Sequence, residues 1–140
     1  MLYLDTSILI TVLTAEADSA RAQSWFLAQA PDVIAISEWV RTEVASALSI
    51  KIRRKEINHA ERDVAMATFA RLISEVFHVF PVSVADFRMA GNFAGQSSLG
   101  LRAGDALHLA IADQNGATLV TRDRKLAEAA VHLCGRGQHL

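Results

Sequence analysis

Short apolar runs alternate with stretches of helical periodicity along the whole chain. Strand-like runs occupy residues 1–5, 33–36, 77–82 and 118–121, with a weaker run at 131–133, and each is followed or preceded by a helical pattern. Strands that alternate with helices predict a parallel sheet covered by helices on both faces. The predicted fold is therefore an α/β, three-layer α/β/α sandwich with a central, mostly parallel sheet of about five strands.

Capping residues indicate where several helices begin and end. Asn58 with Glu61 has the spacing of a capping box at a helix start, and Ser83 with Asp86 suggests another start. Gly116 predicts the end of the helix that contains Asp105. The glycine-rich stretch 91–104 predicts a helix end and a loop that leads into this helix.

Length and composition favour one domain that covers residues 1–140. Such a chain can bury a core of its own, and its 51% apolar residues leave hydrophobic side chains for a partner surface. No apolar stretch approaches the roughly 20 residues that a membrane-spanning helix needs. The N-terminus has neither a basic leader nor a signal pattern, so we expect a cytoplasmic protein. A single cysteine, Cys134, excludes an internal disulfide and a cysteine-based zinc site.

The charge balance does not itself indicate a nucleic-acid binder. The formal net charge is -1, whereas proteins that bind phosphate backbones are usually strongly basic. The distribution is more informative, because basic residues form two runs: Lys51, Arg53, Arg54 and Lys55, and then Arg122, Arg124 and Lys125. Each run fits either a solvated helix end or a contact to phosphate.

Four acidic residues stand where an α/β domain usually has uncharged ones. Asp5 ends the first apolar run, Asp105 lies near the start of an apolar helix, and Asp123 follows the fourth apolar run. Glu43 lies in the apolar stripe of a helix expected from about residue 38 to 52, a position where a carboxylate needs compensation. Carboxylates that share a cleft repel one another, and a hard divalent cation is the usual remedy.

Each of these residues also has a structural explanation. Asp5 and Asp123 fit helix N-caps, Asp105 suits a helix N-terminus, and Glu43 could pair with a buried arginine. Asp5 and Asp123, however, both follow strands of a parallel sheet. The C-terminal ends of such strands are where open α/β sheets bind ligands, so the two carboxylates meet if their strands are neighbours. We interpret His108, by contrast, as a packing residue, since hard cations with oxygen ligands do not need imidazole.

Taken together, these segments resemble the PIN-domain nucleases, and within them the VapC-type ribonuclease toxins of bacterial toxin–antitoxin pairs. The resemblance is carried, in this order, by the segments LDTS at 4–7, TEVASAL at 42–48, RAGDALHLA at 102–110 and LVTRD at 119–123. Each segment is weak alone, but the ordered set covers almost the whole chain.

The resemblance implies an acidic pocket that binds Mg²⁺ or Mn²⁺ through Asp5, Glu43, Asp105 and Asp123. Asp5 and Asp105 are expected as principal ligands, Glu43 as a ligand or as the group that orients water, and Asp123 as a member of a second metal site or of the surroundings of the first. Thr6 and Thr121 are expected to add hydroxyl groups at the edge.

The implied activity is endonucleolytic hydrolysis of RNA, because divalent ions held by carboxylates can supply the chemistry without a histidine base. We expect Arg102, Arg122 and Arg124 to guide the phosphate backbone. The resemblance also implies a VapB-like antitoxin partner and a homodimer.

Other functions fit parts of the same pattern. A PIN-domain nuclease could act in RNA processing or on DNA, since the acidic pocket specifies the reaction better than the substrate. A receiver-like regulatory module also gathers acidic residues at strand ends, but it needs an aspartate after the third strand, where the sequence has Pro81-Val82-Ser83. A phosphatase with an aspartyl nucleophile needs a second aspartate two residues after Asp5, where Ser7 stands.

Overall fold

The computed structural model describes residues 1–30 and 32–140. Within these residues one sheet contains five short strands, every neighbouring pair is parallel, and the order is β3-β2-β1-β4-β5. The strands are β1 (Leu2–Leu4), β2 (Ile34–Ser37), β3 (His78–Phe80), β4 (Thr118–Thr121) and β5 (Gly137–His139). The predicted α/β class and the first four strands are confirmed.

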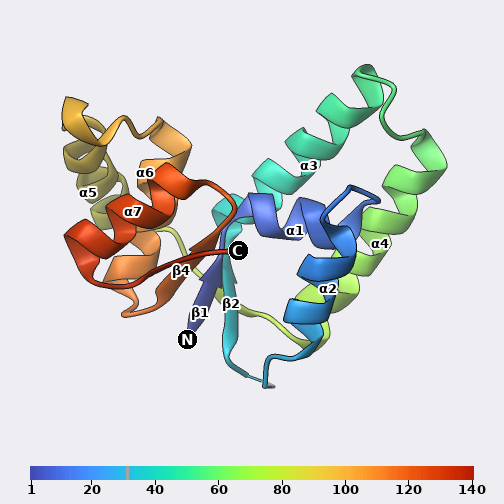
Figure 1. The fold of residues 1–140 in the computed structure, drawn as a ribbon, viewed down its shortest axis with the longest axis horizontal. Coiled ribbons are helices and arrows are strands. Elements are labelled where there is room, and N and C mark those ends of the chain that lie inside the picture. Colours follow the sequence, from blue (N-terminus) through green and yellow to red (C-terminus); the bar gives the residue numbers. More distant parts are fainter. Residues whose placement is uncertain (31) are drawn as a thin grey trace.

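Helices cover both faces of the sheet, as the alternating pattern predicts. They are α1 (Thr6–Leu13), α2 (Ser19–Leu27), α3 (Glu38–Arg53), α4 (His59–Glu75), α5 (Val84–Ala94), the short 3₁₀ helix η1 (Ser97–Leu99), α6 (Ala103–Gln114) and α7 (Arg124–Cys134). Figure 1 shows α1 to α4 on one side of the sheet and α5 to α7 on the other, which gives the three-layer sandwich. In the described part of the chain, no helix is both long and apolar enough to cross a membrane.

The predicted helix starts are correct. Asn58 and Glu61 form a capping box at the start of α4, and Ser83 and Asp86 form another at the start of α5. Gly116 follows the end of α6 with a φ of +62°, a conformation that glycine adopts without strain. Local hydrogen bonds thus fix these boundaries.

The fifth predicted strand is wrong. Residues 131–133 belong to α7, and the true fifth strand is Gly137–His139 at the edge of the sheet. Leu126 and Ala130 point into the core at helical spacing, so Val131 continues that helix on its exposed face. Strand β5 pairs with β4 through its backbone and has no apolar alternation to reveal it.

The glycine-rich stretch is only partly a loop. Gly91 lies inside α5 and Gly104 lies in the first turn of α6, so the predicted loop is confined to the region around η1. A Cβ at Gly91 would meet nothing within 4 Å, so close packing does not require glycine at this position.

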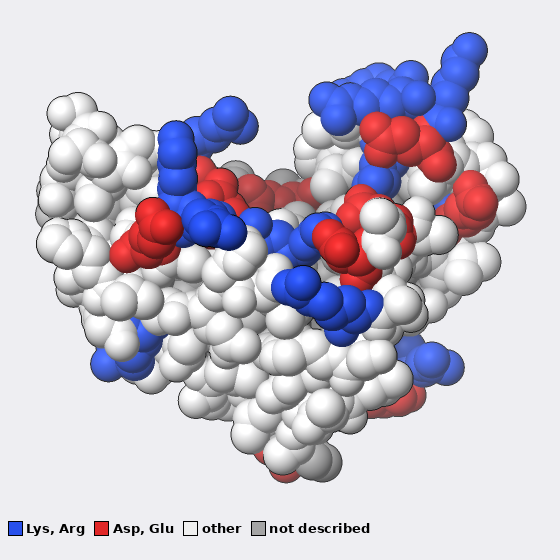
Figure 2. All heavy atoms as spheres, in the orientation of Figure 1, with Lys and Arg blue, Asp and Glu red and all other residues white. Residues whose placement is uncertain are grey.

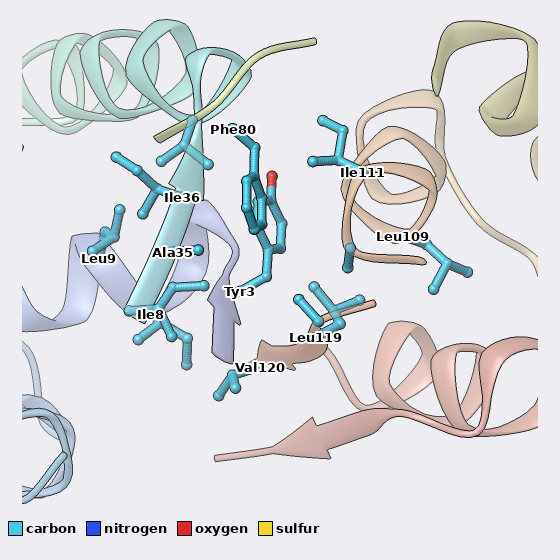
Figure 3. Close-up of a cluster of buried hydrophobic side chains, with 14 of the residues drawn as sticks. Tyr3, Ile8, Leu9, Ala35, Ile36, Phe80, Leu109, Ile111, Leu119 and Val120 are labelled. Atoms are coloured by element: carbon cyan, nitrogen blue, oxygen red, sulfur yellow. The ribbon is translucent and has the colours of Figure 1, made fainter. Parts of the chain in front are cut away.

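The core lies between the sheet and both helical layers. The Tyr3 ring stacks on Phe80 with ring centroids 6.2 Å apart, and Ile36, Leu119 and Ile111 pack around them (Figure 3). Tyr3 is the notable member of this cluster, because its hydroxyl is a polar group that needs a partner when it is fully buried.

The strand order places a ligand-binding position at the end of β1. The chain moves from β1 outward to β2 and β3, then returns to form β4 on the other side of β1. Such a reversal opens a crevice beyond the C-terminal ends of the two central strands. Asp5 follows β1, and the segment 121–123 closes β4, so both lie at this point.

Candidate functional site

Asp5 is buried at the end of β1 and is held by several donors. Its Oδ2 accepts a hydrogen bond of 2.5 Å from Thr121 Oγ1, and its Oδ1 accepts one of 2.6 Å from Ser7 Oγ. Oδ1 also caps α1 by accepting the Ile8 N–H at 3.3 Å. The capping role considered from the sequence is therefore real, and the same hydrogen bonds orient the carboxylate at the switch point.

Thr121 and Ser7 connect the end of β1 to the segment after β4. Thr121 Oγ1 accepts a hydrogen bond of 2.9 Å from the Asp123 N–H, and Ser7 Oγ accepts one of 3.0 Å from the Arg122 N–H. The orientation of Asp5 thus depends on residues more than a hundred positions away in the chain. Thr121 lies where it was expected, whereas Ser7 was not among the predicted site residues.

Asp105 and Asp123 face a common pocket of about 440 Å³. Its wall also contains Gly100, Leu101, Arg102, Arg124 and Lys125. Asp123 caps α7 through the Leu126 N–H at 3.1 Å, and Asp105 accepts the Arg102 N–H at 3.2 Å. Two carboxylates and three cationic side chains therefore line one hollow beside the switch point.

Burial raises the pKa of the Asp105 carboxyl above its ordinary value, and the negative charges of Asp123 and Asp5 raise it further. The hydrogen bond from the Arg102 backbone and the charge of His108 oppose this rise without cancelling it. Like charges thus act on Asp105 from both neighbouring carboxylates, the electrostatic situation that a bound cation relieves.

Glu43 does not line this pocket; helix α3 places it beside the first turn of α6, where its Oε1 lies 3.0 Å from the position of a Cβ on Gly104. Its neighbours Val40, Val44 and Leu48 are buried, as the apolar stripe predicts. Glu43 Oε2 accepts hydrogen bonds from Thr6 Oγ1 at 2.6 Å and from His108 Nε2 at 2.5 Å. A histidine, and not an arginine, therefore compensates this carboxylate.

Burial of Glu43 favours the neutral acid, but the hydrogen bond and the charge of His108 outweigh it, so the pKa of Glu43 lies below its ordinary value. Thr6 and the nearby indole of Trp39 contribute in the same direction. Trp39 Nε1 is buried without a hydrogen-bond partner among the described residues, so it lies close to Glu43 without the alignment of a hydrogen bond.

His108 belongs to a buried hydrogen-bonded chain. Its Nδ1 is 2.9 Å from the Tyr3 hydroxyl, which in turn is 2.7 Å from Ser37 Oγ. The histidine is satisfied, as the packing interpretation expects, but its second nitrogen reaches Glu43. The sequence patterns did not predict the roles of Tyr3 and Ser37 or the contact between His108 and Glu43. Glu43 and His108 are polar residues on the apolar faces of two helices, which is a sign that they pair.

The predicted arginines differ in their surroundings. Arg102 and Arg124 are exposed at the pocket that contains Asp105 and Asp123. The Arg122 guanidinium instead contacts Asp18, donates to Thr11 Oγ1 at 2.7 Å, and lies 3.4 Å from Glu16. An RNA contact by Arg122 therefore has to compete with these intramolecular partners, and for all three residues it stays a prediction.

The residue types at this edge suit a hard divalent ion, because the donors are carboxylate and hydroxyl oxygens around a crowded Asp105. Within residues 1–30 and 32–140, however, no three acidic, histidine or cysteine side chains gather closely enough to hold a metal ion. Asp105 and Asp123 share a pocket, Asp5 is hydrogen-bonded to Thr121, and Glu43 is hydrogen-bonded to His108. Their role as metal ligands stays a prediction.

Comparison with known proteins agrees with this fold. The sequence matches the family described as PIN domain over residues 2–131. None of the curated proteins matches the chain.

Several solved structures have the same fold. FitAcB from Neisseria gonorrhoeae aligns with a TM-score of 0.76 and 17% identity, over 100% of this chain and 97% of that one. VapC20 from Mycobacterium tuberculosis, described as a sarcin–ricin loop cleaving toxin, aligns with a TM-score of 0.73 and 20% identity, over 92% and 95% of the two chains. VapBC2 from Rickettsia felis, bound to a DNA fragment from its promoter, aligns with a TM-score of 0.65 and 22% identity, over 92% and 93%. At these identities the likeness establishes the fold.

Proposed function

The chain belongs to the PIN-domain family, and on this basis we propose that it is a metal-dependent endoribonuclease of the VapC type, a toxin that hydrolyses RNA phosphodiester bonds. One observation carries the proposal. The strand order brings Asp5 to the switch point beside Thr121, while Asp105 and Asp123 share a pocket with Arg102, Arg124 and Lys125. Acidic groups beside cations suit a phosphodiester together with a cation that compensates the carboxylates.

The proposed ligands of Mg²⁺ or Mn²⁺ are Asp5, Glu43, Asp105 and Asp123. When bound, the ion supplies the neutralisation of phosphate oxygens and the activation of water that phosphodiester hydrolysis requires. The protein's own contribution is orientation. Thr121 and Ser7 fix the Asp5 carboxylate, and Thr6 fixes Glu43, which either binds the ion or orients the water.

Cationic side chains flank the acidic edge on two sides. Figure 2 shows a notch with acidic atoms at its depth, and Lys and Arg side chains over both the α7 side and the turn between α3 and α4. This arrangement supports RNA binding by Arg102 and Arg124, since a backbone that crosses the notch meets positive charge on either side of the carboxylates. The neighbouring Lys125 lines the same pocket.

Cleavage of RNA by the purified protein tests the activity. We expect Asp5→Asn to abolish cleavage of single-stranded RNA in Mg²⁺ or Mn²⁺, because the amide removes the negative charge at the switch point. Excess chelator should have the same effect on the wild type. Asp63→Asn is the matched control, since Asp63 is exposed on α4.

Sequencing of RNA ends after brief induction of wild type and Asp5→Asn identifies the substrate. Cleavage that persists in chelator, or equal RNA profiles for the two proteins, would reject the proposal. A DNA strand of the same sequence distinguishes a ribonuclease from a nuclease that acts on DNA.

We propose in addition a VapB-like antitoxin as partner and a homodimer as the assembled unit. The similar structures, which include FitAcB and VapBC2, support the antitoxin partner. The homodimer rests on the family resemblance and on the apolar residues that the composition leaves for a partner surface. Coexpression with the small neighbouring reading frame should give a stable complex that lacks cleavage activity. Light scattering of the free protein should give twice the 15.2 kDa mass of one chain, and a monomeric, uninhibited protein under these conditions would contradict both parts.

A further inference from the structure

We propose that His108 is the positioning residue of Glu43: it holds one carboxylate oxygen, Oε2, and leaves the other, Oε1, as the atom that acts in the site. Tyr3 and Ser37 fix the imidazole from behind. The inference rests on the proposed nuclease function and adds residues that the acidic pattern does not contain.

The chain of hydrogen bonds is continuous from the core to the carboxylate. Ser37 Oγ and Tyr3 OH are 2.7 Å apart, Tyr3 OH and His108 Nδ1 are 2.9 Å apart, and His108 Nε2 and Glu43 Oε2 are 2.5 Å apart. The chain joins β1, the end of β2, α6 and α3. Each of these elements packs in the core, so the imidazole ring has a fixed plane.

The chemistry of the partners sets the direction of the last bond. Glu43 Oε2 is a carboxylate oxygen that also accepts a hydrogen bond from Thr6 Oγ1, so at the short contact with His108 it accepts again, and Nε2 carries the hydrogen and donates. Burial raises the pKa of Tyr3, which therefore keeps its proton as a donor to Nδ1 or to Ser37. The side chain of His108 is only 4% exposed, so water does not substitute for these partners.

The two oxygens of Glu43 consequently differ. Oε2 is occupied by Thr6 and His108, whereas Oε1 has no hydrogen-bond partner among the described residues. Oε1 lies against the first turn of α6, 3.0 Å from where a Cβ on Gly104 would stand. A carboxylate held in this way presents a single oxygen to an ion or a water molecule, in one orientation.

A purely structural pairing would make the same bond, so the experiment has to separate support of the fold from orientation of Glu43. Two substitutions of His108 separate its hydrogen bond to Glu43 from its hydrogen bond to Tyr3. In His108→Gln the amide nitrogen can replace Nε2 and still donate to Glu43, whereas in His108→Asn the shorter amide reaches toward Tyr3 but not toward Glu43. Both variants bury a neutral amide, so they carry a similar cost in stability.

We expect His108→Asn to lower kcat about 10- to 100-fold, the usual cost of losing a partner of a metal-site residue. KM for RNA should stay within about two-fold, because the proposed RNA contacts are made by other residues, Arg102 and Arg124. His108→Gln should recover most of the kcat. Affinity for Mn²⁺, measured by calorimetry on each variant, should fall for Asn and recover for Gln.

A measurement on the metal-free wild type provides a readout that does not depend on activity. The ¹⁵N chemical shifts of the His108 ring in chelator should show a hydrogen on Nε2. Equal kcat and Mn²⁺ affinity for the Asn and Gln variants, or an unprotonated Nε2, would overturn the inference. If His108→Asn does not fold, the ring shifts and the Gln variant still decide it. An active Asp5→Asn would instead reject the nuclease proposal and leave the ring measurement valid.

Discussion

Gly104 determines how closely helix α6 can approach Glu43. The residue lies in the first turn of α6, one position before Asp105, and a Cβ there would be 3.0 Å from Glu43 Oε1 and 4.0 Å from the ring of Trp39. Its backbone is helical, so the absence of a side chain serves the close approach and not an unusual φ. A single methyl group at this position would push against the oxygen that we propose to be active.

We therefore expect Gly104→Ala to lower nuclease activity at least 10-fold while the melting temperature stays equal or rises. Alanine stabilises a helix by about 1 kcal/mol relative to glycine, which opposes the cost of the contact. Assays of RNA cleavage and thermal unfolding measure the two effects. The matched control is Gly91→Ala in α5, where an added Cβ meets nothing within 4 Å. That variant should be at least as stable and fully active, and an equal loss in both would contradict the argument.

At this scale the sequence reveals candidates but not their pairing. Asp5, Asp105 and Asp123 could be placed because strand ends and helix starts fix where such residues lie. The contact between Glu43 and His108 could not, since it joins residues 65 positions apart on two helices whose packing no local pattern specifies. Arg122 illustrates the converse, because its position next to Asp123 does not reveal its ion pairs with Asp18 and Glu16.

At the scale of elements, Glu16 joins three parts of the fold. It precedes α2, pairs with Lys51 near the end of α3 at 2.6 Å, and lies 3.4 Å from the Arg122 guanidinium. Burial of Glu16 favours the neutral acid, but hydrogen bonds from Lys51 and Thr11 and the two positive charges prevail, so its pKa lies below 4.5. Glu16 thereby links the basic end of α3, through Lys51, to the segment after β4, through Arg122.

The sign of this shift predicts how stability depends on pH. The folded protein holds the Glu16 proton less tightly than the unfolded chain, so the stabilisation is complete above the ordinary value of 4.5 and is lost as the pH falls through the lower folded value. We expect Glu16→Gln to reduce the free energy of unfolding by about 1 kcal/mol at pH 7. The difference from wild type should vanish below that range. Urea unfolding at several pH values measures it, and Glu75→Gln, at an exposed position on α4, should show no such trend.

Strand β5 shows which elements a sequence pattern can identify. The buried strands β1, β2 and β4 have apolar runs because both of their faces are covered. Gly137–His139 has none, and its place depends on backbone pairing with β4 and on close contact with α7. The predicted strand at 131–133 was wrong for the same reason, since the apolar side chains there belong to a helix.

The contact at Gly137 gives a test of this edge. A Cβ at Gly137 would be 2.4 Å from the Ala127 carbonyl oxygen and 2.8 Å from Ala130 Cβ, so either β5 or α7 would have to move. We expect Gly137→Ala to destabilise the protein by about 1–3 kcal/mol, the usual range for overpacking. Chemical unfolding measures this value, again with Gly91→Ala as control. An unchanged midpoint of unfolding would show that β5 can shift to accommodate the methyl group without loss of stability.

At the scale of the whole molecule, the Lys and Arg side chains on both sides of the acidic edge predict how RNA binding responds to salt. Each phosphate neutralised on a single strand contributes about 0.7 to the slope of log K against log salt concentration. We expect Arg102→Ala and Arg124→Ala each to lower the magnitude of this slope by about that amount, measured by fluorescence anisotropy in chelator so that RNA is bound but not cut. Arg21→Ala on the exposed face of α2 should leave the slope unchanged. A slope that neither Arg102→Ala nor Arg124→Ala changes would place the RNA elsewhere.

The central position of β1 has a consequence for the moment during synthesis at which the acidic edge is completed. Asp5 precedes its partner Thr121 by 116 positions, so β4 must be synthesised and insert beside β1 before the two can meet. A nascent chain on the ribosome therefore exposes the early strands without a completed acidic edge. Any activity that depends on this edge therefore waits until β4 has emerged and paired with β1, and under the proposed function this delay leaves time for a separately made antitoxin to be present.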